Sequence, residues 1–458
     1  MQAHTATTGV HPVDARPPLG QLFTLGLQHV LVMYAGAVAV PLIIGSALDL
    51  DKATMAFLIS ADLFCCGIVT LIQCIGFGRF GIRLPVIMAV TFTAVGPMIS
   101  IGQNPELGLQ GIFGATLAAG AISLLLVPLV GKIIRFFPPI VTGIVITSIG
   151  LSIIGVGINW AAGGVGSPNY GAPKYLLTSL LVLVFILLIT RYVKGFFANI
   201  AVLLGLGFGF ILALVMGEVS FEGMGEAQWF AVILPFHFGP PKFEIWSILT
   251  LTIVMLITFI ESMGMFLALG EIVERPVDRR RLEKGLNVDA LGTVIGGLFN
   301  TFPHTSFSQN VGLVGVTGVR SRWVGVMAGG ILLALGLVPK MSLLVASIPT
   351  FVLGGAGIVM FGMVLATGIK ILSQVDYEKQ SHNTFIVAIS LGMALIPTVA
   401  PKFFSQLPPA LEPILHSGIL LASVTAVILN VYFNGLGDVA TNVEETKEEF
   451  TTDTVKEA

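Results

Sequence analysis

The most unusual chemical group in this chain is Glu261, a single carboxylate in an otherwise uncharged and mostly apolar stretch from Leu249 to Gly270. Inserting an acid near the centre of a membrane helix costs roughly 2.5 to 3.5 kcal/mol. Such a residue is usually retained where it faces a polar cavity and handles a proton, an ion or a substrate. The structural alternative is a buried acid that a neighbouring donor satisfies.

A second group of polar side chains suits a flat heterocycle. Gln309 and Asn310 are adjacent amides beside Ser308, and primary amides offer both hydrogen-bond donors and acceptors. They match a ring edge on which C=O and N–H groups alternate. Thr91 and Phe92 occupy the corresponding place in the first half of the chain, where Phe92 offers a ring face for stacking. Each alone is typical of packing, but with Glu261 they form a candidate binding site.

Three other polar residues lie in apolar runs, and two of them allow two interpretations each. His29 can shuttle a proton or donate to a ligand, or it can be satisfied by neighbouring helices. Asp289 begins a short apolar segment, where it is either a helix N-cap or a proton-coupling carboxylate. Asp62 can orient another polar residue. The sequence alone leaves these alternatives open.

The segments that must position these residues are irregular. The third hydrophobic segment of the first half, LPVIMAVTFTAVGP, begins at Pro85 and ends at Gly96-Pro97. Its counterpart, FPHTSFSQNVGLVGVTG, begins at Pro303 and contains repeated glycines. Short segments interrupted by Gly and Pro at corresponding places in two halves indicate a transporter binding site. Non-helical backbone at membrane depth is tolerated where it lines a cavity or is buried in protein.

The composition places the whole chain in a membrane. Of its 458 residues 55% are hydrophobic and only 10% are charged, far below the roughly 25% of soluble proteins. Hydrophobic windows predict fourteen segments, although several are shorter than the roughly 20 residues of a straight span. They lie near residues 21–45, 55–77, 84–101, 111–130, 138–158, 175–190, 198–217, 245–270, 288–300, 304–317, 323–346, 350–372, 383–398 and 412–434.

Charge supports this count. With fourteen crossings and a cytoplasmic N-terminus, 18 of the 23 Lys and Arg residues fall on the cytoplasmic side, as the positive-inside rule expects. We therefore expect a cytoplasmic tail over 1–19, a seven-span repeat over 20–218, an extracytoplasmic loop over 219–242, a second repeat over 243–436, and a cytoplasmic tail over 437–458. An odd number of spans per repeat makes the second repeat inverted relative to the first.

Several classes are disfavoured. A net charge of −2 without a basic patch argues against nucleic-acid binding. No enzyme motif and no cofactor or metal motif is evident, and Cys65, Cys66 and Cys74 are interpreted as packing residues because their spacing matches neither a metal site nor a disulfide framework. A passive channel and an anion transporter or exchanger remain alternatives, although the latter would use helix N-termini and positive groups rather than a carboxylate.

These residues also resemble the pattern of a known family. The run from Gln309 to Gly318, QNVGLVGVTG, fits the signature of the nucleobase–ascorbate transporters, and the Gln28-His29 pair and the glutamate of FIESMG also match. The similarity extends over essentially all fourteen segments. Within the family the chain is most similar to bacterial uric acid and xanthine permeases, through QHVLVMYAGAVAVPL, DLFCCGIVTL and FPHTSFSQNVGLV.

The resemblance implies roles for individual residues. Glu261 would accept hydrogen bonds from purine ring N–H groups, Gln309 would form hydrogen bonds with the other ring edge, and Phe92 would stack on the ring. Asn310 would support affinity and His29 the geometry of the site. Asp289, together with Glu261, would couple transport to protons.

One departure bears on substrate preference. Many xanthine transporters of this family carry a second acid one turn after the span-eight glutamate, where this chain has Met265. Losing a negative charge near the ligand favours a more anionic purine, and urate is largely a monoanion at neutral pH. Thr91 matches the position that helps to separate urate from xanthine preference, so urate is expected first and xanthine second.

The sequence thus predicts an all-α polytopic membrane protein with 7+7 inverted repeats, broken spans 3 and 10, and no cofactor. By resemblance, a core domain (spans 1–4 and 8–11) holds the site, and a gate domain (spans 5–7 and 12–14) makes the other wall and a homodimer contact. The expected function is proton-coupled uptake of urate and xanthine across a bacterial inner membrane by alternating access. The alternatives are an anion transporter of the same fold and a symporter for another nucleobase such as uracil.

Overall fold

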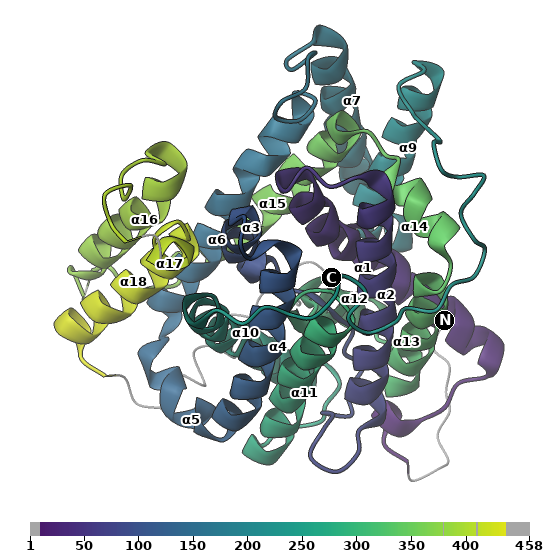
Figure 1. The fold of residues 1–458 in the computed structure, drawn as a ribbon. Coiled ribbons are helices and arrows are strands. Elements are labelled where there is room, and N and C mark those ends of the chain that lie inside the picture. The colour runs from purple at the N-terminus through teal and green to yellow at the C-terminus, as the bar shows by residue number, and fades with distance from the viewer. Residues whose placement is uncertain (1–9, 379, 409–410, 437–458) are drawn as a thin grey trace.

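The computed structural model of the protein describes residues 10–378, 380–408 and 411–436, and the fold is almost entirely helical (Figure 1). The predicted tail over 437–458 and the first nine residues of the tail over 1–19 lie outside the described residues. The elements of the first half are η1 (Pro12–Asp14), α1 (Leu19–Ala47), α2 (Lys52–Ile75), β1 (Met88–Val90), η2 (Phe92–Ala94), α3 (Val95–Gln103), α4 (Gly108–Leu126), η3 (Val127–Leu129), α5 (Val130–Ile133), η4 (Ile134–Phe136), α6 (Pro139–Ala161), α7 (Pro173–Tyr192), α8 (Phe196–Asn199) and α9 (Ala201–Val215).

The second half repeats this order. Its elements are α10 (Ile245–Ile272), α11 (Arg279–Leu298), β2 (His304–Ser306), α12 (Ser308–Thr317), α13 (Arg322–Gly336), α14 (Pro339–Ala346), α15 (Thr350–Leu372), α16 (Asn383–Val399), α17 (Glu412–Leu415) and α18 (Gly418–Asn434). Acidic N-caps define where long helices begin. Asp51 accepts from Thr54 N ahead of α2, and Glu244 accepts from Trp246 N and Ser247 N ahead of α10.

Seven helices in the described part of the chain are long and apolar enough to cross a membrane, or eight if α13 and α14, bent by 80°, count as one span. Three shorter apolar helices, α9, α16 and α18, accompany them. The chain is therefore a multi-pass membrane protein. The exact number of fourteen crossings stays a prediction.

The third and tenth segments are broken as predicted. Each consists of a three-residue strand followed by a short helix, β1 with α3 and β2 with α12. The two strands pair antiparallel at the centre of the molecule, with Ala89 opposite Thr305. This pairing satisfies backbone groups that a non-helical segment would otherwise leave open in an apolar interior. It also brings the second half against the first in the opposite direction.

The helix contacts are reciprocal between the two halves. α2 packs on α13 just as its counterpart α11 packs on α4, and α1 packs on α13 as α10 packs on α4. Likewise α7 contacts α9 as α16 contacts α18, and the latter two lie side by side at one edge of the molecule (Figure 1). Contacts of this kind are what two repeats related by an approximate two-fold axis produce.

These contacts divide the helices into two groups. One group contains α1–α4 and α10–α14, and the other contains α6–α9 and α15–α18. Glycines permit the closest approaches within each group. A Cβ on Gly67 of α2 would lie 2.5 Å from Leu333 N of α13, and one on Gly354 of α15 would lie 2.1 Å from Ala161 N at the end of α6. We name the groups the core group and the gate group.

The described part of the predicted N-terminal tail is held against the core group. Asp14 forms ion pairs with Arg275 (2.8 Å), which follows α10, and with Arg322 (2.7 Å), which begins α13. Trp323 Nε1 donates to Asp14 O at 3.2 Å, and the Arg16 guanidinium lies 3.8 Å from the Trp323 ring centroid. The segment thus joins the ends of α10 and α13.

Asp14→Asn is expected to destabilise the protein by about 1–2 kcal/mol, because it removes a charge that two arginines share. Partial burial tends to raise the pKa of Asp14, but Arg322 and Arg275 outweigh it and the pKa lies below the usual 3.8. The stabilisation is therefore present above that value and is lost as the pH falls through the lower folded pKa. Thermal unfolding in detergent at several pH values measures this. The exposed pair Arg279–Glu283 supplies the control, Glu283→Gln, and an equally small effect at Asp14 would contradict the prediction.

One sequence expectation about a helix start is wrong. Asp289 does not begin a helix, because α11 starts ten residues earlier at Arg279 and Asp278 is its N-cap, accepting from Arg281 N at 2.8 Å. The first turns of α11 carry Arg279, Arg280, Arg281, Glu283 and Lys284, so a hydropathy window cannot detect them. Asp289 lies in the middle of the helix and is buried. The N-cap alternative is thereby removed.

Candidate functional site

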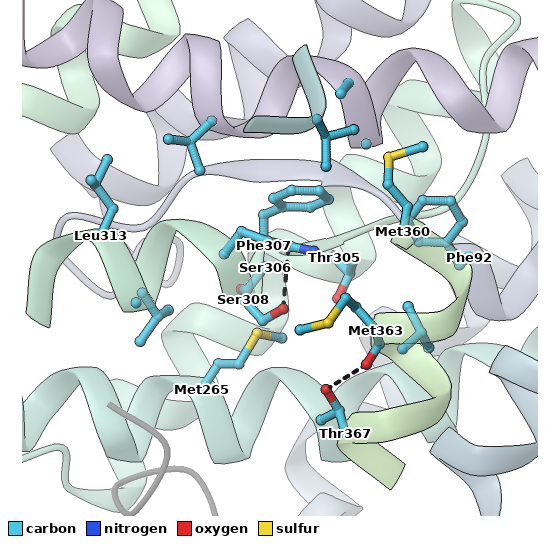
Figure 2. A pocket seen from close by; sticks show the side chains of 18 of the residues that line it. Phe92, Met265, Thr305, Ser306, Phe307, Ser308, Leu313, Met360, Met363 and Thr367 are labelled. Carbon is cyan, nitrogen blue, oxygen red and sulfur yellow. Dashed lines mark hydrogen bonds between the residues drawn. The ribbon is translucent and has the colours of Figure 1, made fainter. Parts of the chain in front are cut away.

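A cavity of about 460 Å³ lies between the core group and the gate group. The core side is formed by α1, α10 and the two strand–helix junctions, and the gate side by α6, α15 and the α8–α9 turn. Figure 2 shows Met265 and Ser308 on one side, with Met360, Met363 and Thr367 of α15 opposite. The volume falls within the range of small-molecule sites, and the lining is mostly apolar with a few polar groups, as such sites usually are.

Six residues predicted for the site line this one cavity. They come from α10, from the β1–α3 junction and from the start of α12, which lie far apart in the sequence. They are Glu261, Met265, Thr91, Phe92, Ser308 and Gln309.

Glu261 is half-buried at the cavity wall, and its nearest described donor is the hydroxyl of Thr93, which donates to Oε1 at 3.4 Å. Thr91, in contrast, uses its own hydroxyl to accept from Thr93 N at 3.2 Å. Thr91 therefore shapes the turn after β1, while Thr93 holds the carboxylate. The long hydrogen bond leaves Glu261 with accepting capacity for a ligand.

Thr93→Val is expected to weaken substrate binding by about three- to ten-fold, because the carboxylate of Glu261 loses its positioning donor at a cost near 1 kcal/mol. The fall should appear in KM more than in the maximal rate. Thr250→Val is the matched control, since Thr250 lies on the same helix as Glu261 and its buried hydroxyl has no hydrogen-bond partner among the described residues. Equal KM values for both variants would refute this role.

The amide of Gln309 is exposed at the first turn of α12. Ser308 Oγ donates to Gln309 Oε1 at 3.2 Å, which leaves the amide nitrogen available to a ligand. The backbone N–H groups at this helix start also favour negative charge on a ligand. Gly318 ends α12 in the left-handed conformation with φ 65°, so the helix has only ten residues.

Phe92 is partly buried and lies at the junction between the two groups. Its ring makes an edge contact with Phe361 of α15, with ring centroids 6.0 Å apart. Phe307 lines the cavity as well, and its ring lies so close to α1 that a Cβ on Gly36 would be 2.5 Å from it. Aromatic faces therefore occur on the core side of the cavity, where a planar ligand can stack.

Three predicted site residues do not line the cavity, and His29 and Asn310 are the first two. Asn310 is buried behind the wall, where its Nδ2 lies 2.9 Å from His29 O and 3.0 Å from His29 Nδ1. The pair ties α12 to α1. In this conformation His29 and Asn310 hold the start of α12 in place and do not face the ligand space.

Asp289 also lies behind the cavity. Both of its carboxylate oxygens are buried and make no hydrogen bond of standard geometry to a described residue, although the Ser262 hydroxyl approaches them. Ser262 is adjacent to Glu261 in sequence, and its Oγ is 3.1 Å from Thr305 Oγ1 on β2. A carboxylate with so few hydrogen-bond donors in an apolar interior is costly when it is charged.

Sequence reasoning missed Thr93 and the gate-side residues Met360, Met363 and Thr367. A threonine two residues after Thr91 carried no signal of its own, since hydroxyls at this spacing commonly cap turns. Met360 and Met363 lie in an apolar helix, where methionine usually fills a core. The available signal was the spacing of Met360, Met363 and Thr367, three and then four residues apart, which places them on one face of α15.

Comparison with known proteins identifies the family of the chain. A family model described as "Permease family" matches residues 20–403. The chain belongs to the nucleobase–ascorbate transporter family. As a member of this permease family it is a transporter and not an enzyme, as the sequence indicated.

Two relatives of this permease cover nearly the whole chain. The uric acid transporter UacT of Escherichia coli strain K12 is 65% identical over 93% of this chain and 89% of the relative. The xanthine permease of Bacillus subtilis strain 168 is 44% identical over 92% of this chain and 95% of the relative.

The fold of the permease is also found among solved structures. The transmembrane domain of the cyanobacterial bicarbonate transporter BicA superposes with a TM-score of 0.59 at 16% identity, covering 90% of this chain and 97% of that one. At this identity the likeness concerns the fold alone. It confirms the predicted inverted-repeat architecture for the permease.

Proposed function

We propose that this permease takes up oxidised purines, urate in preference to xanthine, together with protons across a bacterial inner membrane. The observation that carries the proposal is the convergence of a carboxylate, an amide and an aromatic ring on one cavity: Glu261, Gln309 and Phe92. The names of relatives at 65% and 44% identity point to the same substrates.

Each of these three residues suits one feature of a purine. The carboxylate of Glu261 accepts hydrogen bonds from ring N–H groups, and the amide of Gln309 pairs with an edge of alternating C=O and N–H. Phe92 stacks on the planar ring. Met265 and Thr91 add no charge to the wall, and the start of α12 favours an anion, which together suit urate.

Transport proceeds by alternating access, in which the core group moves against the gate group and exposes the cavity to one side at a time. In this proposal the core comprises spans 1–4 and 8–11, within repeats at 20–218 and 243–436 that a loop over 219–242 joins. Both termini are cytoplasmic. The gate helices carry many exposed apolar side chains, which lipid covers or which form the contact of a homodimer.

Protons couple to transport through Asp289 and Glu261. Protonation of one carboxylate removes a charge that is costly to carry through an occluded state. Substrate binding and protonation then favour each other, and this linkage is reciprocal.

The alternative function is anion exchange by a transporter of the same fold. Such a site would use helix N-termini and positive groups. The carboxylate of Glu261 in the cavity disfavours a small inorganic anion, because like charges repel.

Radiolabelled urate and xanthine uptake into vesicles, with a pH gradient and then a sodium gradient, tests the proposal. We expect accumulation with the pH gradient, collapse with a protonophore, and competition by neither sulfate nor bicarbonate. If uracil competed more strongly than urate, the assigned substrate would change from urate to uracil. Uptake that a protonophore leaves unchanged would indicate a passive channel.

A further inference from the structure

A cluster of three metal-binding side chains lies away from the purine cavity. Asp62 and Cys66 are one turn apart on α2, and His304 begins β2. All three are fully buried, and their ligand atoms lie within 4.8 Å of one another. Cys66 Sγ is 3.8 Å from each Asp62 oxygen and 3.7 Å from His304 Nε2.

The orientation of His304 is fixed by the backbone. Its Nδ1 lies 2.9 Å from Phe302 O, and a carbonyl oxygen can only accept, so Nδ1 carries the proton. Nε2 is then the nitrogen with the free lone pair, and it faces Cys66. A ring nitrogen held by a backbone carbonyl, with the other nitrogen free, is the usual arrangement of a metal-binding histidine.

Asp62 is oriented in a similar way. The hydroxyl of Thr301 donates to Asp62 Oδ1 at 3.0 Å. The other partner recorded for the carboxylate is the Cys66 thiol, at a distance too long for a strong hydrogen bond. A buried carboxylate with so few hydrogen-bond donors is costly in free energy. A cation between the three side chains would supply the missing positive charge.

We propose that Asp62, Cys66 and His304 bind a divalent cation with affinity for sulfur, of which Zn²⁺ fits best. Zinc bonds of about 2.0 Å to O or N and 2.3 Å to S place tetrahedral ligand atoms about 3.5 Å apart. This is close to the 3.7 and 3.8 Å that separate Cys66 Sγ from His304 Nε2 and from the Asp62 oxygens, and the fourth tetrahedral position is left to a further ligand. A thiolate and a carboxylate neutralise the two charges of the ion, so the site is uncharged in an apolar interior. The thiolate selects zinc over magnesium or calcium.

The position of the cluster indicates what the ion does. It joins α2 of the first repeat to β2 of the second, beside the β1–β2 pairing that carries the cavity junctions. None of its three ligands lines the cavity. The ion is therefore a structural link between the repeats, and its presence is independent of which substrate the permease carries.

The test measures metal in the full-length protein purified in detergent after expression with added Zn²⁺. We expect about one zinc per chain by elemental analysis in the wild type, and about ten-fold less in Cys66→Ser and His304→Gln. Cys65→Ser is the matched control, because Cys65 is the adjacent buried cysteine and lies outside the cluster. It should keep the wild-type metal content.

A second measurement does not depend on the variants folding. Wild-type protein expressed with Co²⁺ should show the near-ultraviolet sulfur-to-cobalt charge-transfer band and the visible bands of tetrahedral cobalt. Wild-type protein without that band and with no bound zinc would overturn the proposal and leave a hydrogen-bonded cluster. So would equal metal contents in Cys65→Ser and Cys66→Ser. Urate uptake is measured separately, so a failure here leaves the transport proposal untouched.

Discussion

Glu261→Gln is expected to abolish accumulation of urate and xanthine while the protein still folds and reaches the membrane. The carboxylate can accept two N–H hydrogen bonds from the ring, whereas the amide presents one acceptor and one donor that meets a ring N–H unfavourably. Losing a charge-assisted hydrogen bond in a partly dry site costs about 3 kcal/mol, which corresponds to roughly 100-fold in affinity. Radiolabelled uptake, normalised to protein in the membrane, measures the loss.

Glu261→Asp is the matched control, because it keeps the charge and shortens the side chain by one methylene group. It should retain measurable uptake with weaker affinity, since the carboxylate no longer reaches Thr93 Oγ1 in the same position. Titration of purified protein with urate separates binding from transport. Robust uphill uptake of both purines by Glu261→Gln would overturn the assignment of this residue.

The site residues that could be predicted are polar residues whose burial in an apolar segment costs free energy. An acid such as Glu261 and an amide such as Gln309 in apolar runs require a polar cavity, and the structure places both on the same one. Paired Pro- and Gly-rich interruptions indicated where helices break, and β1–α3 and β2–α12 are those breaks. The free-energy cost of such a residue follows from its own type and from its apolar neighbours in the sequence, so it can be recognised without knowing which distant residue it contacts.

The features that could not be predicted depend on a partner far away in the chain. Thr93 holds Glu261 only because the β1–α3 junction lies beside α10, and a threonine in an apolar run costs little. His29 and Asn310 were expected near the ligand, but their mutual hydrogen bonds place them behind the wall. The start of α11 was missed because its first turns are charged.

Ser262 lies next to both acids of the proposed coupling pair, adjacent to Glu261 in sequence and beside Asp289 in space. Glu261 and Ser262 are neighbours on α10, Ser262 Oγ contacts Thr305 of β2, and the same hydroxyl approaches Asp289 on α11. A change of charge at Asp289 therefore reaches the wall of the cavity through one side chain. This arrangement gives the two acids different tasks, with Glu261 facing the ligand and Asp289 facing protein.

Asp289→Asn is accordingly expected to bind urate but fail to accumulate it. With one proton per substrate, a gradient of one pH unit supplies about 1.4 kcal/mol, enough for ~10-fold accumulation by the wild type. Asparagine has nearly the shape of aspartic acid but carries no titratable proton, so the variant's accumulation ratio should fall to about one. Urate binding and counterflow exchange, which need no net proton movement, should persist at near wild-type levels.

The comparison with Glu261→Gln makes this division of tasks testable, since that variant should lose binding and exchange together. Vesicles with an imposed pH gradient report accumulation, and preloaded vesicles without a gradient report exchange. If Asp289→Asn still concentrates urate ~10-fold, protons are carried by another group, and Glu261 on the cavity wall is the other acid of the proposed pair. If it loses binding as well, Asp289 supports the shape of the site through Ser262 and does not act as a separate proton-coupling residue.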